Sequence, residues 1–146
     1  MTDTLRRMAQ CDCLAIRQAA RQITQFYERH LSKAGLTANQ YAILRKLSGA
    51  ECLSIGALAE SMVMDATTVT RAIKPLLRDG LLGAVPARDR RTRLIRVTAR
   101  GRTKLGAADR HWREAQDTFE QAFGAADAQA LRRTMWRVVE TVPAVE

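Results

Sequence analysis

The strongest constraint on the fold is a pair of short helical patterns in the middle of the chain. Ser54 is a residue type that caps helices, and the first pattern runs from it to about residue 61. The second begins after Asp65, a similar cap, and ends at Asp79-Gly80. A turn over residues 62–65 joins them, so the two helices must pack against each other. Their shared inner face comprises Leu58, Ala59, Met62, Val69 and Ile73.

A strongly basic stretch follows this helix pair. Short apolar runs at residues 81–85 and 94–97 flank it, which predicts a two-stranded hairpin with a charged tip. Residues 86–104 hold eight cations against the single acid Asp89, so +7 of the chain's net charge of +9 lies in 19 residues. Two crossed helices followed by a basic hairpin are typical of a winged helix-turn-helix, whose second helix enters the major groove of DNA.

Longer helical patterns lie on both sides of this unit. Apolar residues recur at three- and four-residue steps from residue 4 to 31, and again in two helices over 99–123 and 125–142, which Thr98 and Gly124 precede. We expect a mainly α fold with a small β-hairpin wing. The expected organisation is one domain over 1–146, with a winged-helix part at 36–98 and dimerisation helices at 4–32 and 99–142. A single chain would leave these apolar stripes partly exposed, which predicts a homodimer.

The sequence also predicts which residues contact DNA. The helix over 66–78 carries no acidic residue, as proximity to phosphate requires, and its outward face holds Thr67, Thr68, Thr70, Arg71 and Lys74. The hairpin supplies the second group, Arg88, Asp89, Arg90, Arg91 and Arg93, and arginines are attracted by the negative potential of a narrow minor groove. Asp89 is close enough in sequence to orient the guanidinium of Arg91.

Three ordered motifs resemble those of the MarR family of bacterial winged-helix regulators. They are GLTANQY at 35–41, MDATTVTR at 64–71 and DRRTRLIRVTARG at 89–101, the last with Val97 where the family has Leu. The resemblance implies a homodimer on a palindromic operator with half-sites about 10 bp apart. It also implies that Arg91 enters the minor groove beside Asp89, and that a small organic, aromatic acid-like effector releases a repressor from DNA.

A second resemblance concerns Cys13, which is similarly placed to the reactive cysteine of the organic-hydroperoxide-sensing (OhrR-type) branch. Those sensors hold the thiolate with tyrosines four and fourteen residues later; here Tyr27 matches the second and Arg17 replaces the first. Cys11 and Cys13 lie two residues apart on the expected helix, so their side chains point about 200° apart and cannot pair easily. A peroxide-responsive repressor is therefore the alternative to the organic effector, and a packed interface cysteine is the other interpretation.

Several function classes find no support in the sequence. The chain has no membrane-spanning run or signal peptide, which favours the cytoplasm. The cysteines and histidines show no metal-ligand spacing, and no catalytic set or cofactor motif is present, so we expect neither an enzyme nor a bound cofactor. Two further alternatives stay open: a winged-helix protein-interaction module and an architectural DNA-binding protein without sequence preference. The sequence gives neither the operator nor the sign of regulation.

Overall fold

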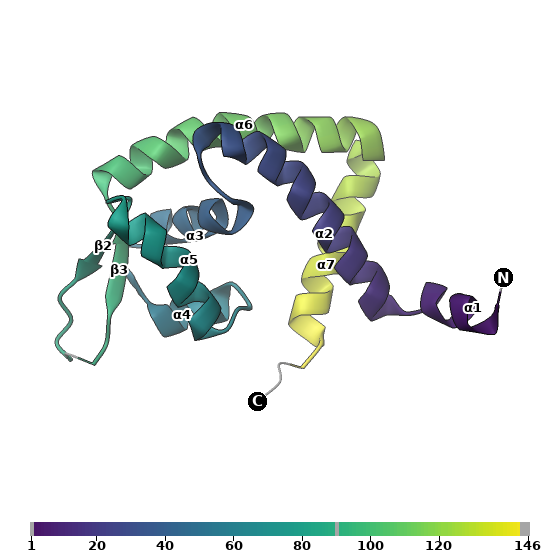
Figure 1. The fold of residues 1–146 in the computed structure, drawn as a ribbon, viewed down its shortest axis with the longest axis horizontal. Coiled ribbons are helices and arrows are strands. Elements are labelled where there is room, and N and C mark those ends of the chain that lie inside the picture. The colour runs from purple at the N-terminus through teal and green to yellow at the C-terminus, as the bar shows by residue number, and fades with distance from the viewer. Residues whose placement is uncertain (1, 90, 144–146) are drawn as a thin grey trace. The chain divides into compact units, whose positions relative to one another are not determined.

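The computed structural model describes residues 2–89 and 91–143, which form two compact units, residues 1–112 and 113–146. In chain order the elements are α1 (Asp3–Ala9), α2 (Asp12–Leu31), the 3-10 turn η1 (Ser32–Ala34), α3 (Ala38–Ser48), β1 (Leu53–Ser54), α4 (Ile55–Ser61), α5 (Ala66–Arg78), β2 (Leu82–Val85), β3 (Leu94–Val97), α6 (Ala99–Phe123) and α7 (Ala125–Thr141) (Figure 1). The expectation of a mainly helical chain with a small sheet is confirmed.

The core of the first unit lies between α3, α4, α5 and the sheet. Ile43, Leu44 and Leu47 of α3 are completely buried, and they belong to one apolar cluster with Leu58 of α4 and Ile73 of α5. Four of the five residues expected on the inner face of the helix pair are buried, and the fifth, Met62, is half-buried against the cluster. The predicted packing of the two helices is therefore confirmed.

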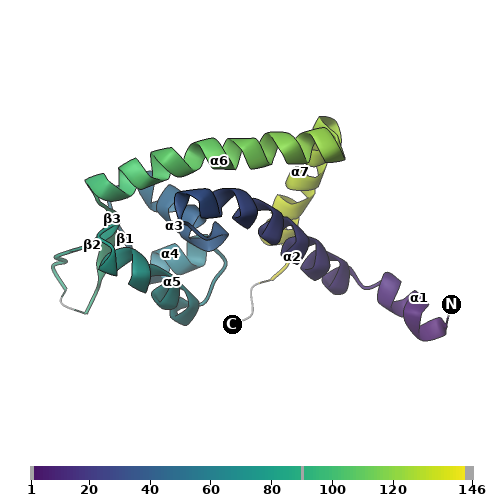
Figure 2. The same cartoon turned by 45° about the horizontal axis from the view of Figure 1, so that its top comes forward.

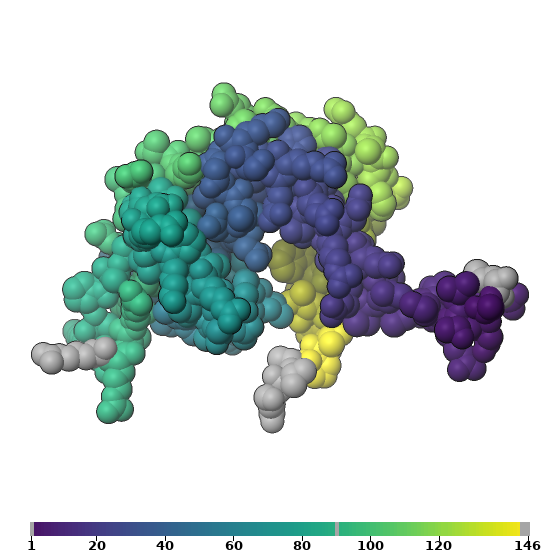
Figure 3. Space-filling view, in the orientation of Figure 1, coloured from purple at the N-terminus to yellow at the C-terminus, as the bar shows by residue number. Residues whose placement is uncertain are grey.

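The sheet has three short antiparallel strands in the order β1-β3-β2 (Figure 2). Leu82 pairs with Val97 and Val85 with Leu94, so the predicted hairpin forms, and Leu53 of β1 pairs with Ile95 on the other side of β3. In the space-filling view the hairpin extends from the body of its unit as a narrow projection (Figure 3). It has the shape of a wing.

Local caps explain why the helices of this unit begin where they do. The Thr37 hydroxyl accepts the Gln40 N–H while the Gln40 side chain accepts the Thr37 N–H, both at 3.1 Å, which forms a capping box at the start of α3. Ser54 caps α4 by accepting the Ala57 N–H. Thr98 accepts the Gly101 N–H at 3.0 Å, and a Cβ at Gly101 would lie 2.1 Å from the Leu81 carbonyl oxygen. Only glycine therefore allows α6 to start so close to the strand.

The first expected helix is interrupted, and this corrects the sequence analysis. Cys11 has an extended backbone (φ −83°, ψ 108°) and caps α2 by accepting the Leu14 N–H on its sulfur. No residue of α1 is buried, so no packing holds the chain helical across this point. The argument that Cys11 and Cys13 point apart on one helix consequently does not apply.

A polar cluster links α3 to α6. The Tyr41 hydroxyl donates to Asp109 Oδ1 at 2.9 Å, and the Arg45 guanidinium contacts the same carboxylate oxygen while lying over the Tyr41 ring. Burial raises the pKa of Tyr41, so its hydroxyl keeps its proton at neutral pH. The ring also stacks on Trp112, with 6.4 Å between centroids. This cluster fixes the first half of α6 against α3.

The second unit holds the end of α6 and all of α7. The rings of Phe119 and Phe123 stack at 5.2 Å, and an Arg132–Glu120 ion pair at 3.1 Å joins the two helices. Large apolar side chains of α7 nevertheless stay exposed, including Trp136 at 61%. The unit does not cover its own apolar surface.

Candidate nucleic-acid interface

Helix α5 is anchored at its start by Asp65. One carboxylate oxygen accepts the Thr68 N–H at 2.8 Å, and the other accepts the Thr68 hydroxyl at 2.6 Å. These bonds, that of the hydroxyl first, lower the pKa of Asp65, so the cap is ionised at neutral pH. A carboxylate at this position also complements the positive end of the helix dipole. Asp65 therefore fixes the first turn of α5. Because its carboxylate is bonded to Thr68, it is not a free acidic group on the outward face of that helix.

The hydrogen bonds divide the residues expected on the outward face of α5. Thr68 donates its hydroxyl proton to Asp65, and Thr70 donates its own to the Ala66 carbonyl at 2.8 Å. A hydroxyl carries one proton, so in this arrangement neither can donate to a phosphate, although both can accept from a base. The remaining three, Thr67, Arg71 and Lys74, are exposed, and within the described residues their side chains keep their donors available.

Asp89 accepts two backbone hydrogen bonds near the tip of the wing. Its Oδ1 accepts the backbone N–H of Arg91 at 2.9 Å, and its carbonyl accepts the Thr92 N–H at 3.1 Å. The carboxylate thus bonds to the backbone of Arg91, whereas the sequence suggested a bond to the Arg91 guanidinium. Arg88, Arg91 and Arg93 are exposed around it, and Arg90 lies outside the described residues.

The two predicted contact elements lie on one side of the first unit. In Figure 1 the start of α5 and the tip of the hairpin both lie at the lower side, whereas the end of α5 meets the start of α6 at the upper side. The turn between α4 and α5 lies at the lower side too. It contains Val63, which is 72% exposed with a φ of +53°, a conformation that β-branched residues rarely adopt. No sequence signal pointed to this residue.

The two residues predicted for a redox site are not brought together within one chain. Cys13 is exposed in the first turn of α2, whereas Tyr27 packs against the core of the unit near the other end of that helix. Fourteen residues of helix separate them by about 21 Å. Tyr27 therefore cannot hold the thiol of its own chain.

Among residues 2–89 and 91–143, no three metal-binding side chains come close enough together to hold an ion, and no helix combines the length and apolarity needed to cross a bilayer.

A helix pair whose second helix has a capped, acid-free outer face, beside a basic two-stranded wing, defines a winged helix-turn-helix protein. The MarR family model matches residues 36–91, from the start of α3 to the tip of the wing. The structure resembles that of the M. tuberculosis transcriptional regulator MosR in complex with DNA, with 34% identity, a TM-score of 0.79, and coverage of 88% of this chain and 92% of that one. The chain belongs to the MarR family of winged helix-turn-helix transcriptional regulators.

Two more relatives extend the comparison. The transcriptional activatory protein BadR of Rhodopseudomonas palustris is 36% identical over 89 residues, which are 58% of this chain and 51% of BadR, so the match spans about half of that relative. The transcriptional repressor CouR, bound to a 23-mer DNA duplex, has a TM-score of 0.82 at 17% identity over 90% of this chain and 94% of its own. At that identity the likeness to CouR concerns the fold alone.

Proposed function

We propose that the chain is a homodimeric, sequence-specific DNA-binding regulator of transcription. One observation carries the proposal: the start of α5 and the tip of the wing lie on the same side of the unit, the wing presents exposed arginines, and α5 carries the exposed cations Arg71 and Lys74 in the turns that follow its start. On this proposal Thr67, Arg71 and Lys74 contact DNA in the major groove. Arg91 enters the adjacent minor groove, with Arg88 and Arg93 beside it.

The exposed apolar side chains support the homodimer. Trp136, Val139 and Val142 near the end of α7 are 61%, 47% and 61% exposed, and Leu5 and Met8 of α1 are about half exposed. Residues of this kind are normally covered by a partner. A second copy is the partner that makes the recognition helices a symmetric pair, and a symmetric pair binds a palindromic site with half-sites about 10 bp apart.

We further propose that the regulator is a repressor released by a small organic, aromatic acid-like effector, as the family resemblance implies. BadR is named as an activatory protein, so whether this chain represses or activates transcription needs its own measurement. A reporter gene behind the chain's own operator decides it. Deleting the regulator raises expression if it represses and lowers expression if it activates.

Selection from a random DNA library tests the function. The expected product is an inverted repeat, bound by two copies, with affinity that falls log-linearly and steeply with salt. Binding of all sequences with equal affinity would indicate an architectural DNA-binding protein. If the chain bound no DNA at every salt concentration tested, the result would indicate the alternative function, a winged-helix protein-interaction module.

A thiol switch is the second candidate for release from DNA, and the exposure of both Cys11 and Cys13 favours it. Because Cys11 lies at the cap of α2 with an extended backbone, the two thiols are not held on opposite faces of one helix. Cumene hydroperoxide should then release the wild type from the selected duplex and leave Cys13→Ser bound. Cys52→Ser, which removes the half-buried cysteine, is the control. An equal response of Cys13→Ser and wild type would exclude Cys13.

A further inference from the structure

The Thr68 hydroxyl is held in one orientation at the start of α5. It donates its proton to Asp65 Oδ2 at 2.6 Å, while the backbone N–H of Thr68 donates to Oδ1 of the same carboxylate at 2.8 Å. These bonds engage both carboxylate oxygens, so the carboxylate cannot turn without breaking one of them. A hydrogen bond to a charged oxygen is also stronger than one between neutral groups. The hydroxyl proton therefore points back toward the cap of the helix.

The charge of Asp65 fixes the direction of this bond. The bonds from the hydroxyl and the backbone N–H of Thr68 lower the pKa of the carboxyl group, so it is ionised at neutral pH. An ionised carboxylate only accepts hydrogen bonds, whereas a threonine hydroxyl has one proton and two lone pairs. Thr68 must therefore be the donor toward Asp65, and only its lone pairs remain for a ligand.

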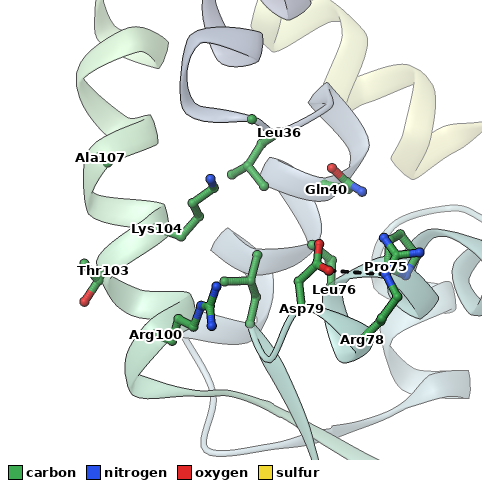
Figure 4. Close-up of a pocket in the computed structure, with 12 residues that line it drawn as sticks. Leu36, Gln40, Pro75, Leu76, Arg78, Asp79, Arg100, Thr103, Lys104 and Ala107 are labelled. Carbon is green, nitrogen blue, oxygen red and sulfur yellow. Dashed lines mark hydrogen bonds and ion pairs between the residues drawn. The ribbon is translucent and has the colours of Figure 1, made fainter.

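Thr68 is exposed on the helix face that the proposed function assigns to DNA. Arg71 lies exposed one turn further along that face. Asp79, the next acid after Asp65 in the sequence, lies beyond the opposite end of α5, where it pairs with Arg78 at 3.2 Å (Figure 4). The negative charge at the start of α5 is therefore the one that holds the Thr68 proton.

The neighbouring threonines lack this arrangement. Thr67 is exposed, and within the described residues its hydroxyl makes no hydrogen bond, so it can donate or accept as a base requires. Thr70 donates to the carbonyl of Ala66, a neutral acceptor, and its side chain is half-buried. Thr68 is thus the exposed threonine whose hydroxyl polarity a charged group determines.

From this arrangement we propose that Thr68 determines base specificity, with Asp65 as its positioning residue: the Thr68 oxygen accepts a hydrogen bond from the exocyclic amino group of adenine or cytosine. In the major groove adenine N6 and cytosine N4 are donors, whereas guanine N7 and O6 and thymine O4 are acceptors. Guanine or thymine would place two acceptors against each other. The inference rests on the proposed function and adds to it a preference for A or C at one position of each half-site.

The hydroxyl bond is tested first on the full chain without DNA. Thr68→Val removes the hydroxyl at nearly unchanged volume and should raise the pKa of the Asp65 carboxyl group, because the bond that stabilises its ionised form is lost. Carboxyl ¹³C NMR over a pH titration measures this. Thr103→Val removes an exposed hydroxyl of α6 and should leave the pKa of Asp65 unchanged. An unchanged pKa in Thr68→Val overturns the proposal, whether or not the chain binds DNA.

Selection from a random DNA library then reads the base preference. Wild type and Thr68→Ser should take A or C at one position of each half-site, and Thr68→Val should lose that preference. Asp65→Asn keeps a capping oxygen for the Thr68 N–H, and its amide can donate to the hydroxyl. The hydroxyl proton then faces DNA, so the preference at that position should change to G or T. A loss of the cap alone would not produce this change.

The outcomes separate the inference from the proposed function. A wild type that selects no sequence contradicts the proposed function and the inference with it. A wild type that selects an inverted repeat, with the same base profile in Thr68→Val, contradicts the inference alone. An unchanged profile in Asp65→Asn does so too. Circular dichroism checks that the variants fold, and the comparison of Thr68→Val with Thr68→Ser decides the matter if Asp65→Asn does not.

Base analogues measure the contact on the selected duplex. Purine in place of adenine, or 2-pyrimidinone in place of cytosine, removes the amino group at the position that Thr68 reads. With both half-sites changed, wild type should bind roughly tenfold more weakly, because two hydrogen bonds are lost. Thr68→Val should bind both duplexes alike, which controls for the weaker base pair. Equal binding of the two duplexes by wild type overturns the proposal.

Discussion

The winged-helix part and the outer helices differ in how completely they bury their apolar residues. In α3, α4 and α5 the inward side chains are almost fully buried, and seven of the largest, from Ile43 to Leu76, are less than 2% exposed. In α1 and α7 almost no side chain is buried, and Leu5, Met8, Trp136, Val139 and Val142 are about half exposed or more. The apolar core of the winged-helix part is therefore complete within one chain. The outer helices leave exposed the apolar residues that the proposed second copy would cover.

The largest effect that sharpens this comparison is expected in the core of the winged helix. Leu44→Ala should destabilise the chain by about 2–5 kcal/mol, because it opens a cavity among fully buried neighbours. Leu5→Ala makes the same change on α1, where the side chain is 53% exposed, and should cost less than about 0.5 kcal/mol in a dilute monomer. Urea unfolding measures both. Equal losses would show that the two regions do not differ as described.

The second effect should appear in assembly. Trp136→Ala removes a large exposed apolar side chain from α7 and should weaken the dimer by about 2 kcal/mol, or roughly 30-fold in its dissociation constant, as loss of an interface aromatic does. Arg133→Ala, an exposed neighbour on the same helix, should change it little. Sedimentation over a range of concentrations provides the constants. If the dimer were equally stable in both variants, α7 would not be part of the dimer interface.

The third effect concerns the link between α3 and α6. Asp109→Ala leaves the Tyr41 hydroxyl, on a side chain only 7% exposed, without its acceptor, and should destabilise the chain by about 1–3 kcal/mol. Asp117→Ala removes an exposed acid of the same helix and should be nearly neutral. Thermal unfolding at neutral pH compares them. A neutral Asp109→Ala would mean that the cluster contributes nothing to stability.

The smallest effect is a gain at the turn of the helix pair. Val63→Gly relieves the positive φ of a β-branched residue and should stabilise the chain by up to about 1 kcal/mol after the entropy cost of glycine. Val139→Gly, within α7, should instead destabilise it by about 1 kcal/mol. Denaturant midpoints decide the sign. A loss at Val63 would show that its side chain contributes more than the strain costs.

Sequence patterns predicted where α4, α5 and α6 begin, because local capping bonds determine those positions. Ser54, Asp65 and Thr98 each cap the helix expected after them. The break before α2 escaped prediction because cysteine is an unusual cap, and because the apolar steps continue across it. These features depend on neighbours within a few residues.

Other parts of the candidate sites needed the folded chain. The bond from Tyr41 to Asp109 joins residues 68 apart in sequence. No local pattern reports such contacts. The outward threonines of α5 were predicted as a group, but only the hydrogen bonds separate Thr67 from Thr68 and Thr70.

The salt dependence of DNA binding by wild type and Arg91→Ala tests the central claim most directly. On the duplex selected from the random library, wild type should bind with a steep log-linear slope. Arg91→Ala should bind at least about tenfold more weakly, and its slope should be shallower by roughly 2, since a dimer loses two cations that neutralise phosphate charge, at about 0.9 each. Arg113→Ala, an exposed arginine of α6 outside the predicted interface, should match wild type. An unchanged affinity and slope in Arg91→Ala would contradict the assignment of the wing to DNA.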